Sequence, residues 1–216
     1  MALDFVFFDL DGTLADNYDA ITLCIAESVK PFGIKPFSRE TVVRSVGGSI
    51  LNTLKKLAGV EIAELAAPIY AENISRFEMR GLKSMPYSLE ILESLFSRGI
   101  AAACLTNKAQ DSAERICRRL GFSKYLRGVV GTQLRGPRKP EKRFIDSALK
   151  LFGANPKTSA IVGDSPYDYK TAVAGGLMPL LVATGGDSAD SLKLSCPEAE
   201  IFRSLKEAET FILGGE

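Results

Sequence analysis

The chain has 216 residues, of which 46% are hydrophobic and 25% charged, and its 27 basic and 26 acidic side chains give a formal net charge of +1. This balance excludes a global field that would attract nucleic acid or a membrane surface, so we expect neither as a partner. Histidine is absent, which excludes Ser-His-Asp and Cys-His catalysis and histidine-ligated metals, and leaves carboxylates, lysines and hydroxyls to carry any chemistry.

Targeting and redox signals point to the cytoplasm. The amino terminus lacks a charged segment followed by an apolar one, and no apolar run approaches the ~18 residues that span a membrane. The four cysteines are scattered without a CxxC pair, which argues against both a zinc site and a disulfide framework. We therefore expect a cytoplasmic protein.

A run of large apolar residues, Phe5-Val-Phe-Phe8, is followed by two acids, Asp9 and Asp11, and by Gly12. Such a run before a turn signal predicts a buried strand, and open α/β sheets bind ligands at the carboxyl ends of their strands. Two acids there repel each other unless a cation or a proton lies between them, so the spacing indicates a metal site. The alternative, an Asp-Gly turn, accounts for Asp11 but not for Asp9.

Helical patterns follow this strand. Apolar residues recur at three-to-four spacing, Ser38 can cap a helix, and Gly47-Gly48 marks a turn between helices. Pro68 disfavours one continuous helix where it stands. Helices are predicted over 21–29, after Ser38, over 51–57 and over about 61–77. We interpret 16–81 as a small all-helical domain inserted after a strand, although an elaborate crossover connection is the alternative.

From Tyr87 onward, strands alternate with helices. This alternation predicts a parallel sheet covered on both faces, which by the handedness rule is a doubly wound, Rossmann-like α/β core made of residues 1–15 and 82–216. The predicted strands are 100–105, 129–130, 160–162, 180–183 and 199–202, with helices over 87–97, 109–120, 141–152, 167–174 and 204–212.

Two of the later segments offer groups that could bind an anion. Thr106 ends an apolar run and is followed by Asn107 and a helix start, a place that suits a phosphoryl oxygen, although threonine is also a common helix cap. Lys139, before Pro140, lies in a basic stretch from 134 to 143, most of whose charges are better interpreted as a solvated loop.

A second acidic pair ends another strand. Asp164 follows the apolar run Ile161-Val162-Gly163, and Asp168 comes four residues later in the next helix. Asp164 would face the same sheet edge as Asp9 and complete an all-oxygen octahedral site typical of Mg²⁺, with Asp168 as a direct ligand or the holder of a metal-bound water. The alternative for Asp164 is a helix cap.

These four segments, in this order, resemble the signatures of the haloacid-dehalogenase-like hydrolases. Asp9-Leu-Asp-Gly-Thr13 resembles the first, Thr106 the second, Lys139-Pro140 the third and Gly163-Asp-x-x-x-Asp168 the fourth. The resemblance implies a Rossmann-like core with a helical cap and, most similar in cap type, a Mg²⁺-dependent phosphatase of the phosphoglycolate-phosphatase-like branch. Its substrate would be a small phosphorylated metabolite, phosphoglycolate or a sugar phosphate.

The resemblance also implies roles for these residues. Asp9 would attack phosphorus and form an aspartyl-phosphate, Asp11 would act as general acid and base, and the backbone carbonyl of Asp11 would ligate the metal. Thr106 and Asn107 would bind the phosphoryl group and Lys139 would neutralise it. The third signature departs from the commoner Lys-Pro-x-Pro pattern, and Arg138 competes with Lys139.

Other reactions of similar proteins are separated by residue chemistry. Dehalogenases lack an acid at the position of Asp11, phosphonatases use a cap lysine, and β-phosphoglucomutase-like enzymes typically present a cap histidine that this chain lacks. A phosphomutase and a non-catalytic phospho-ligand-binding protein stay as alternatives. Arg44 and the turn at Gly48 lie where this cap type meets its substrate, so we expect one of them to contact the non-phosphate end; an exposed helix residue is the alternative for Arg44.

Overall fold

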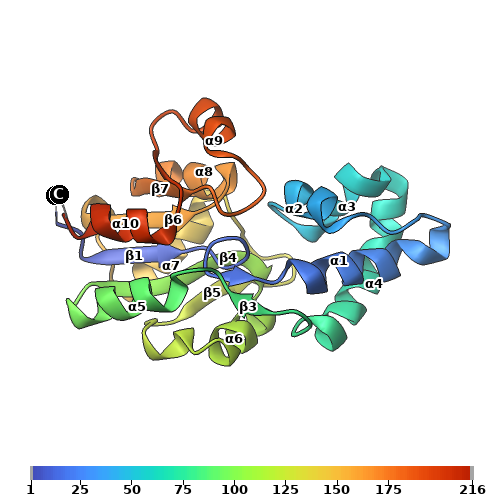
Figure 1. The fold of residues 1–216 in the computed structure, drawn as a ribbon, viewed down its shortest axis with the longest axis horizontal. Coiled ribbons are helices and arrows are strands. Elements are labelled where there is room, and N and C mark those ends of the chain that lie inside the picture. Colours follow the sequence, from blue (N-terminus) through green and yellow to red (C-terminus); the bar gives the residue numbers. More distant parts are fainter. Residues whose placement is uncertain (1, 215–216) are drawn as a thin grey trace. The chain divides into compact units, whose positions relative to one another are not determined.

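A computed structural model describes residues 2–214 (Figure 1). Asp16–Lys83 forms one compact unit, and the residues before it together with those from Ser84 onward form another. The chain passes between the units in β2 (Ala15–Asp16) and β3 (Lys83–Ser84), which pair in a separate two-stranded sheet. None of the helices in residues 2–214 combines the length and apolar character needed to cross a bilayer.

The larger unit is built on a six-stranded sheet in the order β5-β4-β1-β6-β7-β8, with every neighbouring pair parallel. Its strands are β1 (Phe5–Phe8), β4 (Ala101–Ala109), β5 (Val129–Thr132), β6 (Ser159–Gly163), β7 (Met178–Val182) and β8 (Glu200–Phe202). The chain builds outward from β1 in one direction and then in the other, so the strand order reverses at β1. This is the doubly wound arrangement that the alternating pattern predicted, and the predicted fold class is confirmed.

Helices cover both faces of the sheet. α7 and α8 pack against each other on one face, and α5 and α10, which also contact each other, lie in front of the sheet in Figure 1. The sequence did not predict the short helix α9. The bounds are α5 (Ser88–Ser97), α6 (Gln110–Arg119), α7 (Lys142–Phe152), α8 (Pro166–Gly175), α9 (Ala189–Ser195) and α10 (Leu205–Ile212), with 3-10 turns over Phe122–Lys124 and Pro156–Thr158.

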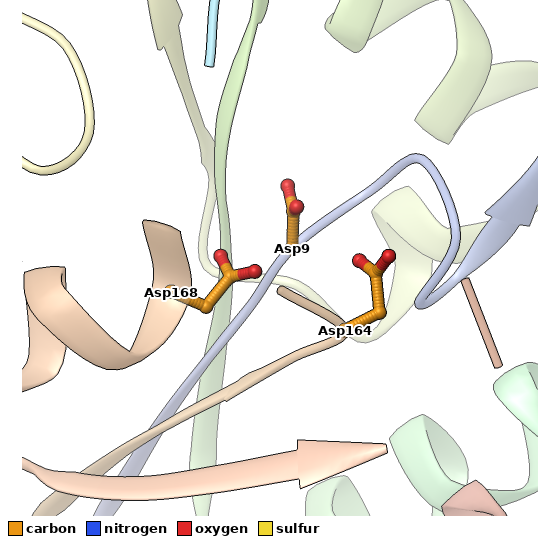
Figure 2. A group of neighbouring side chains, drawn as sticks. All are labelled: Asp9, Asp164 and Asp168. Atoms are coloured by element: carbon orange, nitrogen blue, oxygen red, sulfur yellow. The ribbon is translucent and has the colours of Figure 1, made fainter. Parts of the chain in front are cut away.

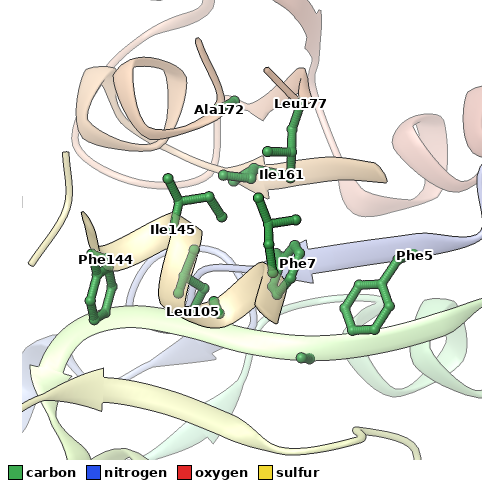
Figure 3. Close-up of a cluster of buried hydrophobic side chains, with 11 residues drawn as sticks. Phe5, Phe7, Leu105, Phe144, Ile145, Ile161, Ala172 and Leu177 are labelled. Carbon is green, nitrogen blue, oxygen red and sulfur yellow. The ribbon is translucent and has the colours of Figure 1, made fainter. Parts of the chain in front are cut away.

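The packing around β1 fixes the position of the residues that follow it. Phe5 and Phe7 belong to one buried cluster with Ile145 of α7 and Ile161 of β6, whose side chains are drawn in Figure 3. Val6 and Phe8, which alternate with them, are also fully buried. Each such side chain contributes about 1.5–3 kcal/mol by leaving water. β1 is therefore held from both faces, and the chain leaves it at Asp9 from a rigid support.

The smaller unit is helical and has a hydrophobic core of its own, to which Ile25, Val42 and Leu54 contribute. Ser38 and Ser49 each accept a hydrogen bond from a backbone N–H one turn later, which caps α2 and α3. Its helices are α1 (Tyr18–Val29), α2 (Arg39–Ser45), α3 (Ile50–Ala58) and α4 (Val60–Phe77), with a 3-10 turn over Lys30–Phe32.

One sequence-based expectation about this unit is wrong. α4 runs from Val60 to Phe77 as one helix with Pro68 inside it, where Pro68 was expected to disfavour a continuous helix. Proline leaves the carbonyl four residues earlier, on Glu64, without its helical hydrogen bond. Both Pro68 and Glu64 are exposed, so water can bind this carbonyl and the helix continues.

Candidate active site

The carboxyl ends of β1, β4 and β6 bring distant segments together at the point where the strand order reverses. Phe8 pairs with Cys104 on one side and with Val162 on the other. Asp9, the next residue, donates its backbone N–H to the carbonyl of Val162 at 2.9 Å. Open α/β sheets hold their ligands at such a switch point, because the two neighbouring loops diverge there. Asp9 and Asp164 thus directly follow β1 and β6, and Thr106 lies in the adjacent strand β4, two residues beyond the partner of Phe8.

Three carboxylates gather at this edge. Asp9, Asp164 and Asp168 each place an oxygen within 4.8 Å of the others, Asp9 and Asp164 from chain just beyond strands and Asp168 from α8 (Figure 2). Asp164 and Asp168 are buried. Burial raises the pKa of Asp9 to about 6, although the Lys139 ammonium acts in the opposite direction. Burial also raises the pKa of Asp164, and the charges of Asp168 and Asp9 raise it further.

Lys139 supplies positive charge to this cluster. Its Nζ lies 2.8 Å from an oxygen of Asp9 and 2.6 Å from an oxygen of Asp168, and only 1% of its side chain is exposed. Burial alone would lower the pKa of Lys139, but the carboxylates of Asp168 and Asp9 raise it overall. Lys139 therefore stays protonated. Buried charges of this kind persist only when they are paired and hydrogen-bonded.

The backbone of Lys139 is held by a side chain from β4. Asn107 donates from Nδ2 to the carbonyl of Lys139 at 3.1 Å and accepts from its N–H through Oδ1 at 2.8 Å. Asn107 was predicted to bind the phosphoryl group, and the structure gives its amide this other contact, which fixes where the lysine enters the site. A substrate contact of Asn107 stays a prediction.

Asp168 is shared between helix capping and the cluster. One of its oxygens accepts from Nζ of Lys139, and the other accepts from the hydroxyl and the N–H of Ser165, at 2.6 and 3.2 Å. Ser165 and Asp168 form the capping box of α8. The carboxyl presses against Gly163, where an added Cβ would lie 2.1 Å from Cγ of Asp168. Gly163 therefore permits the position of Asp168.

Asp164 is held by groups from two other loops. The Thr13 hydroxyl donates to its Oδ1 at 3.1 Å. Gly185 approaches from the loop after β7, where a Cβ would lie 1.7 Å from Oδ2 of Asp164. The neighbouring Thr184 donates its hydroxyl to the carbonyl of Gly12 at 2.7 Å, which ties this loop to the one after β1. The orientation of Asp164 thus depends on both loops.

Asp11 has a different partner from Asp9. Its side chain is not in the acidic group found among residues 2–214. Nζ of Lys108 lies 2.9 and 3.3 Å from its two oxygens, with 8% of the Lys108 side chain exposed. The carboxylate is held at the same edge of the sheet and apart from the three others. A metal contact by the backbone carbonyl of Asp11 stays a prediction.

The remaining predicted residues fall in two places. Thr106 was predicted to end a strand, but β4 continues to Ala109, and its pairing with β5 shifts between Leu105 and Ala109. Thr106 is buried, and its hydroxyl oxygen accepts from the N–H of Lys108 at 3.2 Å. Arg44 and Gly48 belong to the helical unit. Arg44 is exposed and pairs with Glu40 at 2.7 Å, and Gly48 lies between α2 and α3 with φ +73°. A substrate contact by either residue stays a prediction.

A family model described as haloacid dehalogenase-like hydrolase matches residues 6–182. The chain belongs to this family. A phosphoglycolate phosphatase from Aquifex aeolicus is 27% identical over 83% of this chain and 84% of its own length. The pyrophosphatase PpaX from Oceanobacillus iheyensis is 22% identical over 98% of each chain. The crystal structure of a protein from Lactobacillus delbrueckii subsp. bulgaricus matches this chain with a TM-score of 0.91 and 18% identity. The match covers 99% of this chain and 100% of that one, so the two proteins share a fold.

These comparisons confirm the resemblance drawn from the four signatures. The chain is a phosphatase of the haloacid dehalogenase-like hydrolase family, in its phosphoglycolate-phosphatase-like branch. Sequence reasoning missed the partners of the signature residues: Lys108 for Asp11, Asn107 for the backbone of Lys139, and Ser165 for Asp168. The capping pair was readable from Ser165 and an acid three residues later. The contacts of Lys108 with Asp11 and of Asn107 with Lys139 join residues far apart in the chain, and no local sequence pattern indicates them.

Proposed function

We propose that this protein is a Mg²⁺-dependent phosphatase that hydrolyses a small phosphorylated metabolite, of the phosphoglycolate or sugar-phosphate type, through an aspartyl-phosphate. The observation that carries the proposal is the position of the Lys139 ammonium, 2.8 Å from Asp9 and 2.6 Å from Asp168, in one buried group with Asp164. The relative from A. aeolicus, named a phosphoglycolate phosphatase, supports the substrate class. The cytoplasmic location expected from the sequence is part of this proposal.

The reaction has two steps on Asp9 and Asp11. In the first, an oxygen of Asp9 forms a bond to phosphorus while the bond from phosphorus to the leaving oxygen breaks, and Asp11 gives that oxygen a proton. In the second, Asp11 takes a proton from water as the water attacks phosphorus. The bond between Asp9 and phosphorus then breaks, which releases inorganic phosphate and restores the carboxylate.

Lys139 and Thr106 would act on the transferring group. Negative charge spreads over the phosphoryl oxygens in the transition state, and an ammonium held in a site that excludes water stabilises this charge strongly. Lys139 is held on three sides, by Asp9, by Asp168 and by Asn107 at its backbone, so little reorganisation is needed during the reaction. Thr106, in β4, would donate its hydroxyl to a phosphoryl oxygen.

The donor set fits Mg²⁺. Asp9 and Asp164 offer carboxylate oxygens in a buried group whose burial and mutual charges raise the pKa of both, so a hard divalent cation would relieve an existing repulsion. Asp9, Asp164 and the backbone carbonyl of Asp11 would hold the ion. Asp168 already serves Lys139 and Ser165, which favours a positioning role. When bound, the ion supplies neutralisation of phosphoryl charge.

The test is hydrolysis of a panel containing phosphoglycolate, sugar phosphates, pyrophosphate and an aryl phosphate, with Mg²⁺ and with a chelator. Activity should require Mg²⁺ and should release inorganic phosphate. Pyrophosphate is included because PpaX, a relative over 98% of each chain, is named a pyrophosphatase. Interconversion of sugar phosphates with little phosphate released would instead show a mutase. Tight binding of these compounds without turnover would show a non-catalytic binding protein.

Asp9→Asn should lower kcat by at least about 10⁴-fold, because it removes the attacking carboxylate, while circular dichroism shows an unchanged fold. Asp11→Asn should lower kcat by about 100-fold, the loss typical of a positioned acid–base group. Mass spectrometry after an acid quench should find the phosphoryl group on the peptide that contains Asp9. Asp146→Asn, on the exposed face of α7, is the control. A folded Asp9→Asn protein with nearly full activity would refute the role of Asp9.

A further inference from the structure

Lys108 is a buried cation that none of the proposed steps uses. It follows Thr106 and Asn107 in β4, with 8% of its side chain exposed and its Nζ 2.9 Å from Oδ2 of Asp11. Burying an ammonium is unfavourable unless it is paired. A lysine whose charge served only solubility would extend into water. Its place beside the proposed general acid therefore calls for an explanation within the reaction.

The backbone of Lys108 is fixed as firmly as its side chain. Its N–H donates to the hydroxyl of Thr106 at 3.2 Å, and its carbonyl accepts from the hydroxyl of Thr132 at 3.3 Å. Thr132 also donates to the carbonyl of Asn107 at 3.1 Å. The residue is thus tied to the phosphoryl-binding end of β4 on one side and to β5 on the other. Its ammonium is held at a defined place relative to Asp11.

The proposed role of Asp11 would place this ammonium near the leaving oxygen. To protonate the leaving oxygen, a carboxyl oxygen of Asp11 must come within about 2.6–3.2 Å of it. Nζ of Lys108 lies 2.9 Å from that carboxylate, so it lies within about 6 Å of the leaving oxygen. Lys139 instead contacts Asp9 and Asp168. The two lysines therefore pair with different members of the proposed machinery, Lys139 with the nucleophile and Lys108 with the general acid.

We propose that Lys108 binds an anionic group on the leaving half of the substrate, a carboxylate or a second phosphate, and so selects anionic over neutral leaving groups. The inference rests on the proposed phosphatase function and narrows its substrate class. Phosphoglycolate carries such a group, because a carboxylate follows the carbon that bears its ester oxygen. When this oxygen departs, it adds developing negative charge beside the carboxylate, and an ammonium at this distance stabilises both.

The experiment compares two esters that differ in one group. Phosphoglycolate has a carboxylate where 2-hydroxyethyl phosphate has a neutral hydroxymethyl group, so both leaving groups contain two carbons. We would measure kcat/KM for both with wild-type protein, Lys108→Met, Lys108→Arg and, as a matched control, Lys150→Met on the exposed face of α7. The quantity of interest is the ratio of the two kcat/KM values, because loss of the Asp11 partner alone lowers both together.

Wild-type protein should favour phosphoglycolate, and Lys108→Met should lower this preference at least about 10-fold. Lys108→Arg should retain most of the wild-type preference. Lys150→Met should leave the preference unchanged. A ratio that stays within about twofold in Lys108→Met would overturn the inference and leave the phosphatase function intact. A wild-type preference for the neutral ester would also overturn it, and this arm does not depend on any variant folding. Wild-type protein that hydrolyses neither these esters nor the wider panel would remove both proposals.

Discussion

At the carboxyl end of the sheet, Lys139 has 1% of its side chain exposed and contacts two carboxylates, whereas in the helical unit Arg44 and Glu40 form a pair with 71% and 73% exposed. The distances are similar, 2.6–2.8 Å. The surroundings are not, because water screens the second pair and is excluded from the first. An ion pair of the same length therefore matters for stability and chemistry at the sheet edge, and contributes little to stability in the helical unit.

The comparison extends to the way each charge is supported. Asn107 holds the backbone of Lys139, Ser165 holds Asp168, and Thr13 holds Asp164, so the buried charges form one connected set. Removing one member leaves the others without compensation. Arg44 sits one turn after Glu40 on the outer face of α2, and either can rotate into water.

Lys139→Met tests the buried set and should have the largest effect. The variant leaves Asp9 and Asp168 without their ammonium, so the free energy of unfolding, measured by urea denaturation without Mg²⁺, should fall by about 3 kcal/mol. kcat should fall by about 10²–10³-fold, because the variant lacks the ammonium that would neutralise the phosphoryl group.

Lys142→Met is the matched control, three residues along the same segment. Lys142 pairs with Asp146 at 2.6 Å, but the two side chains are 66% and 47% exposed. Its loss should change stability by less than about 0.5 kcal/mol. Equal losses of stability in both variants would show that burial does not set the strength of these pairs.

Gly163→Ala perturbs the same set without removing a charge. The new Cβ would lie 2.1 Å from Cγ of Asp168, so the carboxyl must move away from Lys139 and Ser165. We expect a loss of about 1–3 kcal/mol in stability, as for other overpacked sites. kcat should fall about 100-fold, because even a small displacement of Lys139, which Asp168 holds, would misplace its charge relative to the reacting group. Gly136→Ala is the control, since its Cβ would meet no atom nearer than 3.4 Å. Comparable kcat values in the two variants would show that Gly163 is not needed to position Asp168.

The succession of strands and helices along the chain, and the ends of β1 and β6, could be read from the sequence. Short apolar runs bounded by turn residues place Asp9 and Asp164 directly after strands, and parallel strands bring these ends to one edge. The strand predicted to end before Thr106 instead continues to Ala109. The helix cap at Ser38 was predicted from its residue type, which suits such a position. These features depend on residues close together in the chain.

Contacts between β4 and distant loops could not be read in the same way. Lys108 meets Asp11 across 97 positions and Asn107 meets Lys139 across 32. Such pairs depend on strand register and on the path of the loop from 134 to 141, and a shift of one residue would turn each side chain to the other face. The same limit applies to Arg138 and Lys139, neighbours of similar charge, of which the backbone brings Lys139 into the cluster.

Arg44→Ala tests the exposed side of the comparison and should have the smallest effect on stability, below about 0.5 kcal/mol by urea denaturation. Its effect on activity distinguishes the two interpretations of this residue. If Arg44 contacts the non-phosphate end of the substrate, KM for the best substrate rises while kcat stays near its wild-type value, because uniform binding is lost. Lys30→Ala is the control, since Lys30 pairs with Glu27 on the same unit and is also exposed. An unchanged KM in Arg44→Ala would make this pair a surface feature only, and specificity would then depend on groups at the sheet edge such as Lys108.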